Sequence, residues 1–359
     1  MGFFNKNIIS FKPTVFGLDM SDFSIKVLQL ECDEKNEEIR SFGAMDIAPG
    51  NIKDGKIINK EKISEIIKEV IKKSGPRKIN TKKVICSVPE SKAFMRIVNI
   101  PKLNDAEAAE AIKWEIEASI PLSIDQVYYD WQFIDFDEKG RQNILTAAVA
   151  KDTINDLIEV LEKAGLEVYG MEVESVASAR SLIKKNEESV QSSLIVDLGS
   201  QKTSFIVVSK GITYFTSSIP FSSESINDAI AKRLNLNIQE AEKVKVNQGI
   251  KYSNGENPIF SAVKSLLENL TQEIEKTIDF YSELSGEASK IEKIILCGGG
   301  ANLNGLISYL AEKLGKEVQL GNPLVNLKID KKTPIINREN SVRYCTVVGL
   351  ALHESIYED

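Results

Sequence analysis

Two aspartates in this 359-residue chain each end an apolar segment and begin a short polar turn. Asp19 follows the apolar residues 15–18, and Asp197 follows residues 194–196. In both places a second apolar segment soon follows, which predicts two strand-turn-strand units. A turn of small residues exposes backbone N–H groups to an anion, and a carboxylate at a strand end can hold a hydrated Mg²⁺. The two turns therefore predict phosphate binding.

The two turns are copies of one another. Residues 18–25 align without a gap on residues 196–203, with aspartate at the second position of each segment. A third strand end, at residues 294–297, runs into the triplet Gly298–Gly300. Backbone without side chains can lie flat against a purine and its ribose. One such turn is common in proteins, but the repeat and the triplet together predict a nucleotide held between two related lobes.

Hydrophobic periodicity predicts the elements that position these turns. Residues 25–30 alternate as a strand does, and residues 63–71 place their apolar side chains on one helix face. Residues 84–170 read as strand, strand, helix, strand, strand, helix, which we interpret as a small α+β subdomain inserted into the first lobe. Residues 263–281 keep one apolar face for under three heptads, which favours a core helix over a coiled coil.

Composition argues against several classes of protein. The net charge is −7 and no broad basic stripe is present, so nucleic acid is not expected as a partner. His353 is the only histidine, which argues against Ser–His or Cys–His catalysis. The four cysteines form no CxxC pair. No apolar run approaches the roughly 18 residues of a membrane span, and the N-terminal segment lacks a signal-peptide pattern. We therefore expect a cytoplasmic protein.

The motifs resemble those of the actin, Hsp70 and FtsA superfamily, in the same order and over nearly the whole chain. Residues 17–21 are similar to its phosphate-1 loop, residues 197–203 to its phosphate-2 loop and residues 296–303 to its adenosine motif. Residues 347–352 resemble its second connecting helix. The resemblance implies an actin-like ATPase fold of the α/β class. Two lobes would each contain a ribonuclease H-like mixed sheet, and the first would carry an FtsA-type α+β subdomain.

The same resemblance implies ATP and Mg²⁺ as cofactors and gives residues their roles. Asp19, Glu174 and Asp197 would be catalytic, with Glu174 at the start of the first connecting helix, and the two aspartates would hold Mg²⁺ through water. Further nucleotide-binding residues would be Ser21, Asp22, Phe23, Ser24, Lys26, Gly199, Ser200, Gln201, Lys202, Thr203, Glu242, Lys245, Gly298, Gly299, Gly300, Asn302 and Leu303.

The resemblance also predicts how the chain divides. The expected units are lobe 1 (1–83), the inserted subdomain (84–170), the first connecting helix (171–192), lobe 2 (193–335) and the second connecting helix, which returns to lobe 1 (336–359).

Within the superfamily, the chain most resembles the PilM family of type IV pilus assembly proteins. The similar segments are residues 100–103, 111–117 and 120–122 around the subdomain helix, 129–132 and 145–150 in its strands, and 164–168 and 171–177 at the junction with the first connecting helix. Actin and Hsp70 lack this subdomain in this place.

The resemblance to the PilM family implies an ATP-binding scaffold or switch in the pilus platform. It would bind the N-terminal cytoplasmic tail of a PilN-type inner-membrane protein and reach the membrane only through that partner. Other platform or motor proteins and self-association stay open. Trp114, Tyr128, Tyr129 and Trp131 could line the groove, since aromatic residues are enriched at interfaces, although core packing is the commoner role of each taken singly.

Two positions depart from the family pattern. Ser21 stands where the family usually has glycine, and Ser222-Ser223 stand where it often has a glycine pair. A serine restricts the turn and adds a Cβ where a phosphate approaches. The departures therefore predict a protein that holds ATP and hydrolyses it slowly, if at all.

Two other functions stay open. The chain could be an actin-fold ATPase or a sugar kinase, which would need an acceptor pocket and a catalytic base. It could also be a filament-forming division protein like FtsA, which shares the inserted subdomain. FtsA ends in a membrane-binding amphipathic helix, whereas residues 352–359 are short and acidic, so we expect an anionic membrane to repel them.

Overall fold

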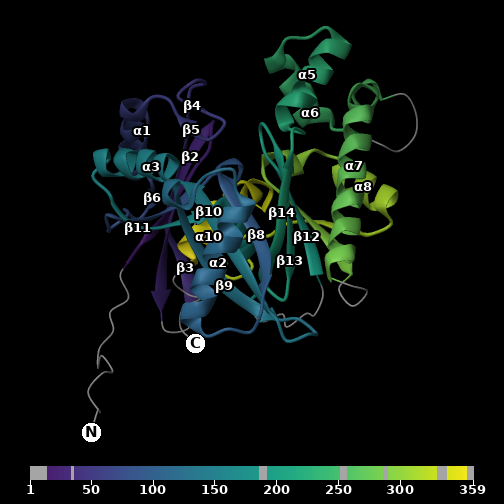
Figure 1. Cartoon of the computed structure of the whole chain (residues 1–359). Helices are drawn as coiled ribbons and strands as arrows, with labels where there is room; N and C mark the ends of the chain where they lie inside the picture. Colours follow the sequence, from purple (N-terminus) through teal and green to yellow (C-terminus); the bar gives the residue numbers. More distant parts are fainter. Residues whose placement is uncertain are drawn as a thin grey trace.

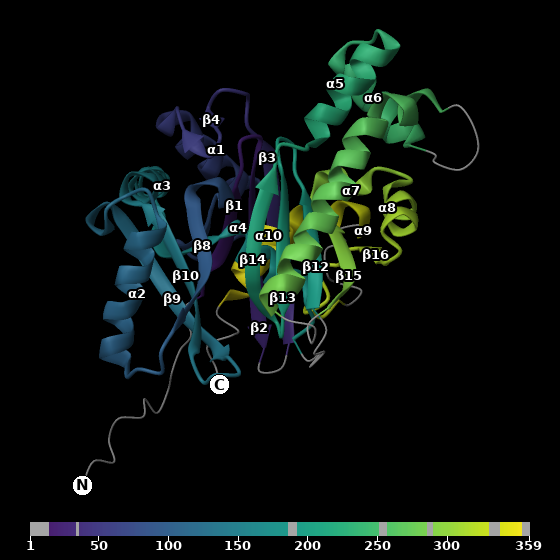
Figure 2. The ribbon, with the colours of Figure 1, turned by 45° about the vertical axis from the view of Figure 1, so that its right-hand side comes forward.

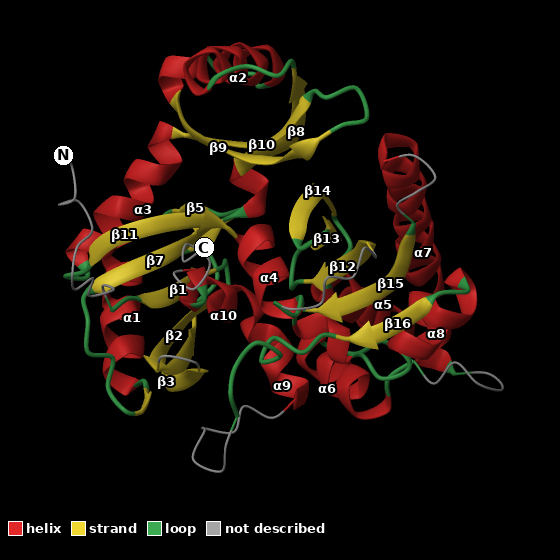
Figure 3. Ribbon diagram, turned by 90° about the horizontal axis from the view of Figure 1, so that it is seen from below, coloured by secondary structure: helices red, strands yellow, loops and turns green. Residues whose placement is uncertain are grey.

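A computed structural model describes residues 14–33, 36–185, 192–250, 257–285, 290–329 and 338–353. It contains two large mixed sheets with two short helices between them, and a smaller sheet beside the first lobe (Figure 3). The actin-like architecture that the sequence predicts is therefore present.

The first lobe is built on a six-stranded sheet. Its strand β1 pairs antiparallel with β2 and parallel with β7, and it is buried along its whole length. Asp19 is the fourth of its five residues, so the sheet fixes the position of this carboxylate. The strand order is β11 (Glu167–Val173), β7 (Lys83–Val88), β1 (Phe16–Met20), β2 (Ser24–Asp33), β3 (Asn36–Asp46) and β6 (Gly75–Pro76).

Two helices pack side by side on this lobe (Figure 1). Asn59 begins the first of them by accepting the N–H of Lys62, as an N-cap residue does. The apolar face predicted over residues 63–71 is buried in one core with the second helix and β1. The helices are α1 (Lys60–Lys73) and α3 (Lys151–Lys163), and a small hairpin of β4 (Ile52–Lys53) and β5 (Lys56–Ile57) precedes α1.

The second lobe repeats the arrangement of the first. Its central strand β12 pairs antiparallel with β13 and parallel with β15, as β1 does with β2 and β7. The repeat in the sequence is therefore a structural repeat. The strand order is β14 (Ile212–Ile219), β13 (Thr203–Ser209), β12 (Ser192–Leu198), β15 (Ile291–Cys297) and β16 (Glu317–Leu320).

Helices and 3-10 turns complete this lobe (Figure 2). The predicted core helix is α7, whose buried side chains belong to the lobe-2 core. It is long, but no helix in the described residues combines the length and apolar character that crossing a membrane requires. The elements are α5 (Ser223–Leu234), α6 (Ile238–Gln248), α7 (Pro258–Ser285), η3 (Gly299–Asn302), α8 (Leu306–Leu314), α9 (Arg338–Ser341) and η4 (Val342–Tyr344).

Two helices, α4 (Glu174–Leu182) and α10 (Cys345–Ala351), cross between the lobes. They touch so closely that a Cβ on Gly349 would lie 1.7 Å from the carbonyl oxygen of Ala177. Arg180 fastens the crossing, because its guanidinium binds the Glu172 carboxylate and donates to the Gly349 carbonyl at 2.9 Å. We call this crossing of α4 and α10 between the two lobes the hinge.

The inserted subdomain is smaller than the predicted range of 84–170. Its three-stranded sheet has one face covered by α2 and has its own core. By contrast β7 and β11 pair with each other in the lobe-1 sheet, and α3 packs in the lobe-1 core. Sequence patterns show local periodicity but not which strand pairs with which. The elements are β8 (Ala93–Ile100), α2 (Asp105–Ser119), β9 (Val127–Phe136) and β10 (Gln142–Ala150), with short 3-10 turns η1 (Glu90–Lys92) and η2 (Ile124–Gln126).

Candidate nucleotide-binding site

A cavity of about 550 Å³ lies between the two lobes, where the predicted turns meet. The β1–β2 turn, the β12–β13 turn, the first residue of α4 and the first two glycines of the triplet all contribute to its wall. Segments that are far apart in the sequence therefore converge on one site. The predicted site residues that line it are Asp19, Ser21, Asp22, Phe23, Ser24, Lys26, Glu174, Asp197, Gly199, Ser200, Gln201, Lys202, Gly298 and Gly299.

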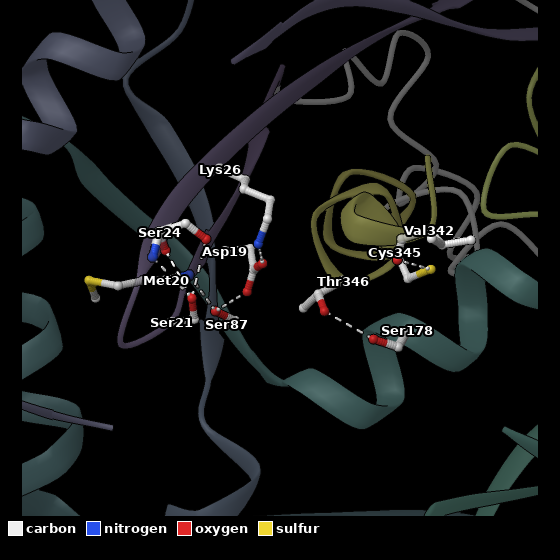
Figure 4. A network of polar contacts seen from close by, with 10 residues as sticks. All are labelled: Asp19, Met20, Ser21, Ser24, Lys26, Ser87, Ser178, Val342, Cys345 and Thr346. Atoms are coloured by element: carbon white, nitrogen blue, oxygen red, sulfur yellow. Dashed lines mark hydrogen bonds and ion pairs between the residues drawn. The ribbon is translucent and has the colours of Figure 1, made fainter. Parts of the chain in front are cut away.

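Asp19 is held from two sides (Figure 4). Lys26 Nζ lies 2.9 Å from Asp19 Oδ2, and Ser87 Oγ donates to Oδ1 at 3.2 Å. Ser87 in turn accepts the N–H of Met20 at 3.1 Å, so neighbouring strands fix the carboxylate. Burial alone would lower the pKa of Lys26, but the Asp19 carboxylate outweighs this effect and raises it above its usual value.

The first turn is closed by its own serines. Ser21 donates its N–H to the Ser24 carbonyl at 3.0 Å, and its hydroxyl accepts the Ser24 N–H at 3.2 Å. The next residue, Asp22, accepts the N–H groups of Asp54 at 2.7 Å and Gly55 at 2.9 Å. Asp22 therefore fastens the β4–β5 hairpin to the wall of the cavity.

The second turn is tighter and needs its glycine. A Cβ on Gly199 would lie 2.7 Å from the Lys202 carbonyl oxygen, which is closer than real side chains come. Helix α5 secures this turn, because the N–H groups of Ser223 and Glu224 donate to the carbonyls of Gly199 and Ser200, each at 3.1 Å. The two copies thus differ: the first turn carries serine, whereas the second has no room for it.

Two further carboxylates have raised pKa values in this cavity. Burial, opposed by Lys202 and reinforced by the charge of Asp19, raises the pKa of Glu174 to about 7. Burial and Asp19 raise the pKa of Asp197 to about 6. Glu174 accepts the N–H of Glu90 at 3.1 Å, and Lys202 Nζ lies 3.9 Å from its carboxylate. A divalent cation would relieve the repulsion among these acids, so the donor set fits Mg²⁺.

No three acidic, histidine or cysteine side chains converge into a direct metal cage within the ranges that the structure describes. The water-mediated contact of Mg²⁺ with Asp19 and Asp197 stays a prediction.

The glycine triplet packs on the second turn. Gly298 has a φ of +78°, and a Cβ there would lie 2.3 Å from Asp197 Oδ1. A Cβ on Gly300 would meet Leu198 at 3.0 Å. These glycines therefore let the chain after β15 pack closely against the end of β12 at the cavity.

Six predicted nucleotide contacts do not belong to the cavity wall. Thr203 is buried and donates to the Phe221 carbonyl at 2.9 Å. Lys245 donates to Ser223 Oγ at 2.6 Å, and burial lowers its pKa. Their roles in ribose and base recognition stay predictions. The six are Thr203, Glu242, Lys245, Gly300, Asn302 and Leu303.

Sequence reasoning missed several residues at this site. Ser87 was detectable as a polar residue within the apolar strand of residues 84–88. Thr346 and Arg343 line the cavity, and Thr346 Oγ1 lies 3.0 Å from Ser178 Oγ across the hinge (Figure 4). Nothing in the sequence around Arg343 points to the site, because only the fold brings it there.

The aromatic residues predicted to line a partner groove lie in different places. Trp131 packs against the subdomain core, and Trp114 is 69% exposed on α2. Tyr128 is at the junction of the subdomain with lobe 1, where its hydroxyl donates to Asn155 at 3.5 Å and Lys151 lies over its ring. Tyr128 is thus the one of these three with described contacts to α3 of lobe 1.

Comparison with known proteins identifies a family model and curated relatives that match this chain. A family model described as "Type IV pilus assembly protein PilM" matches residues 17–355. Cell division protein FtsA of Bacillus subtilis is 26% identical over 191 residues, which is 48% of this chain and 43% of FtsA. FtsA of Pseudomonas aeruginosa is 24% identical over 233 residues, 60% of this chain and 54% of FtsA. The chain therefore matches about half the length of these curated relatives.

Solved structures share the fold. A chain of a structure described as the "PilM-PilN type IV pilus biogenesis complex" has a TM-score of 0.81 and 24% identity, covering 95% of this chain and 98% of that one. MreB5 of Spiroplasma citri bound to AMPPNP has a TM-score of 0.53 and 15% identity, covering 96% and 97%. At these identities the likeness establishes the actin-like fold.

Proposed function

The chain belongs to the PilM family of type IV pilus assembly proteins, and from that premise we propose that it is an ATP-holding switch of the pilus assembly platform. In this role it binds the N-terminal cytoplasmic tail of a PilN-type inner-membrane protein. The observation that carries the proposal is the interlobe cavity, because two matching turns and three cavity carboxylates meet there.

The cavity suits a nucleotide with its phosphates toward the two turns. Backbone N–H groups of the turns and the side chains of Lys26 and Lys202 would bind the phosphate chain. Mg²⁺, when bound through water to Asp19 and Asp197, would neutralise phosphate charge. Because the two aspartates come from different lobes, one nucleotide would hold both lobes in a fixed relation.

Slow hydrolysis follows from the first turn and from Glu174. The Ser21 hydroxyl is bonded within its own turn, and its Cβ occupies space that glycine would leave free. The Glu174 carboxylate accepts the Glu90 N–H, so one of its oxygens is already engaged by the protein. These features favour a bound state over turnover.

The partner tail would bind at the junction of the inserted subdomain and lobe 1. Tyr128, Lys151 and Asn155 meet there from β9 and α3. Both elements are linked to the cavity. Strand β9 pairs with β10, which continues directly into α3, and α3 packs in the same core as β1. ATP would thus change the affinity for the tail, and the tail would change the affinity for ATP by the same factor.

Isothermal titration calorimetry with the full chain tests both parts. We expect ATP–Mg²⁺ to bind with an affinity that Asp19→Ala weakens strongly without changing the far-ultraviolet circular dichroism. We also expect a peptide from the PilN-type tail to bind, and more tightly with ATP present than without it. Asp279→Ala, at an exposed position of α7, is the control for loss of one carboxylate.

Two outcomes contradict the proposal. If neither ATP nor the peptide binds, the switch is wrong. If ATP turns over many times per second without a partner, an actin-fold ATPase or a kinase replaces it. Binding of the full chain to anionic liposomes in a flotation assay would instead support the FtsA-like alternative, which the FtsA relatives keep open.

A further inference from the structure

Arg343 reaches the cavity from the hinge. It lies in η4, immediately before α10, and the Gly298 N–H donates to the carbonyl of its neighbour Val342 at 3.1 Å. This bond holds η4 against the glycine triplet. Arg343 Nε lies 3.9 Å from the point where a Cβ on Gly299 would stand, and the side chain lines the cavity. The backbone from which the Arg343 side chain extends is therefore held beside the glycine triplet.

The charges around the cavity are unbalanced. Six acidic residues and three basic ones line it, and the basic ones are Lys26, Lys202 and Arg343. Lys26 is already paired with Asp19 at 2.9 Å, and Lys202 lies 3.9 Å from Glu174. Within the described ranges, the Arg343 guanidinium has neither a hydrogen bond nor an ion pair. A polyphosphate that enters this acidic cavity meets one cation whose donors are uncommitted.

A guanidinium suits that task. It is always charged, and its planar fork of N–H donors can bind two phosphate oxygens at once. Arg343 and Lys26 of β2 both line the cavity, and the Arg343 charge acts to lower the pKa of Lys26, although Asp19 keeps that pKa raised overall. A phosphate chain between the two turns would thus lie between Lys26 and Arg343.

We infer that Arg343 binds the phosphate chain of the nucleotide from the hinge side of the cavity and so couples phosphate binding to α10. The inference rests on the proposed function, because it assigns a further contact to the same nucleotide site. It gives α10, which packs against α4 at Gly349, a direct link to the ligand in addition to the movement of whole lobes.

Nucleotides with different numbers of phosphates test this contact. In the full chain, Arg343→Gln should weaken ATP and ADP binding roughly tenfold or more, as expected for loss of a charge-assisted bond, and leave adenosine binding unchanged. Arg343→Lys should recover part of the loss, because it keeps the charge but not the fork. Arg77→Gln, which removes an exposed arginine paired with Glu31, is the matched control.

Hydrogen exchange provides a second readout, which a purely structural role would not affect. ATP should slow amide exchange over residues 345–351 in the wild type and less so in Arg343→Gln. Unchanged ATP affinity in Arg343→Gln, or an equal loss for adenosine and ATP, would overturn the inference alone. A wild-type chain that binds neither ADP nor ATP would overturn the nucleotide switch and this inference together.

Discussion

Asp19, Asp197 and Glu174 share one cavity, although charges of the same sign repel each other. Lys26 and Ser87 hold Asp19 in place, while burial and the charge of Asp19 raise the pKa values of the other two carboxylates. The site therefore contains two groups whose charge changes with pH near neutrality. A cation in the cavity would change the protonation of those two groups as it binds.

The raised pKa values predict opposite pH trends for stability and for metal binding. Since Asp197 and Glu174 bind protons more tightly in the folded chain than in the unfolded one, stability without ligand should fall as pH rises from about 4 through 7. Mg²⁺–ATP affinity should rise over pH 5 to 8, by up to about tenfold per unit where one proton is displaced. Calorimetry and thermal unfolding at several pH values measure the two trends.

The variant Asp197→Asn separates the pH trends caused by Asp197 from those caused by other titrating groups. The variant should lose most of the Mg²⁺ dependence of ATP binding, together with the part of both pH trends that is centred near pH 6. Asp279→Asn, at an exposed position of α7, is the control. If Asp197→Asn kept the full Mg²⁺ dependence, Asp197 would not be a metal-binding residue.

At the scale of elements, the hinge depends on how closely α4 and α10 approach. Gly349 is the contact point, and Arg180 connects α4 to α10 and β11 through Gly349 and Glu172. A hydroxyl pair, Ser178 and Thr346, spans the same crossing beside the cavity. A larger side chain at Gly349 would therefore push α4 and α10 apart.

Gly349→Ala tests the hinge. The new methyl group would overlap the Ala177 carbonyl, so we expect a loss of stability of about 1–3 kcal/mol or more, with weaker ATP binding because the turns separate. Gly170→Ala is the matched control, since its nearest atom would lie at an ordinary 3.9 Å. Chemical denaturation measures both variants. If the two variants had equal free energies of unfolding, the close approach of α4 and α10 at Gly349 would not limit stability.

At the scale of the whole molecule, the inserted subdomain touches both lobes. Its β8 edge lies against the β14 edge of lobe 2. Lys210, in the β13–β14 turn, pairs with Asp135 of β9 at 3.1 Å. A cleft of about 1190 Å³ lies between these parts. In the proposed switch, lobe closure around a nucleotide would change this separation, and the ion pair would carry that change to the subdomain.

Lys210→Asp should therefore reduce coupling more than stability. An exposed ion pair contributes only about 0–1 kcal/mol to stability, so unfolding should change little. The factor by which ATP raises affinity for the PilN-type peptide should fall towards one, because repulsion between the two acids separates the subdomain from lobe 2.

The charge-reversed pair restores the contact. Lys210→Asp combined with Asp135→Lys should regain the wild-type coupling factor, measured by peptide titration with and without ATP. Lys139→Asp, elsewhere on the same cleft, is the control for added negative charge. If the single and double variants couple like the wild type, the pair has no part in the switch.

The sequence by itself determined the two turns, their order and several of the helices, because these depend on local patterns. The duplicated segments at Asp19 and Asp197 predict matching strand pairs, and the pairings of β1 and β12 agree. The helix of residues 63–71 and the core helix of residues 263–281 are likewise confirmed.

Only the tertiary structure decided contacts between distant residues. Asp22 lines the cavity and also binds a hairpin 32 positions away. Strand β11 pairs with β7 in the lobe-1 sheet and does not belong to the subdomain. The two strands are far apart in the sequence, so no local pattern reveals this pairing. Arg343 lies beside the glycine triplet because a backbone hydrogen bond joins the Gly298 N–H to the carbonyl of Val342. Periodicity describes which face of an element is apolar, whereas pairing across long loops is chosen by the packing of the whole chain.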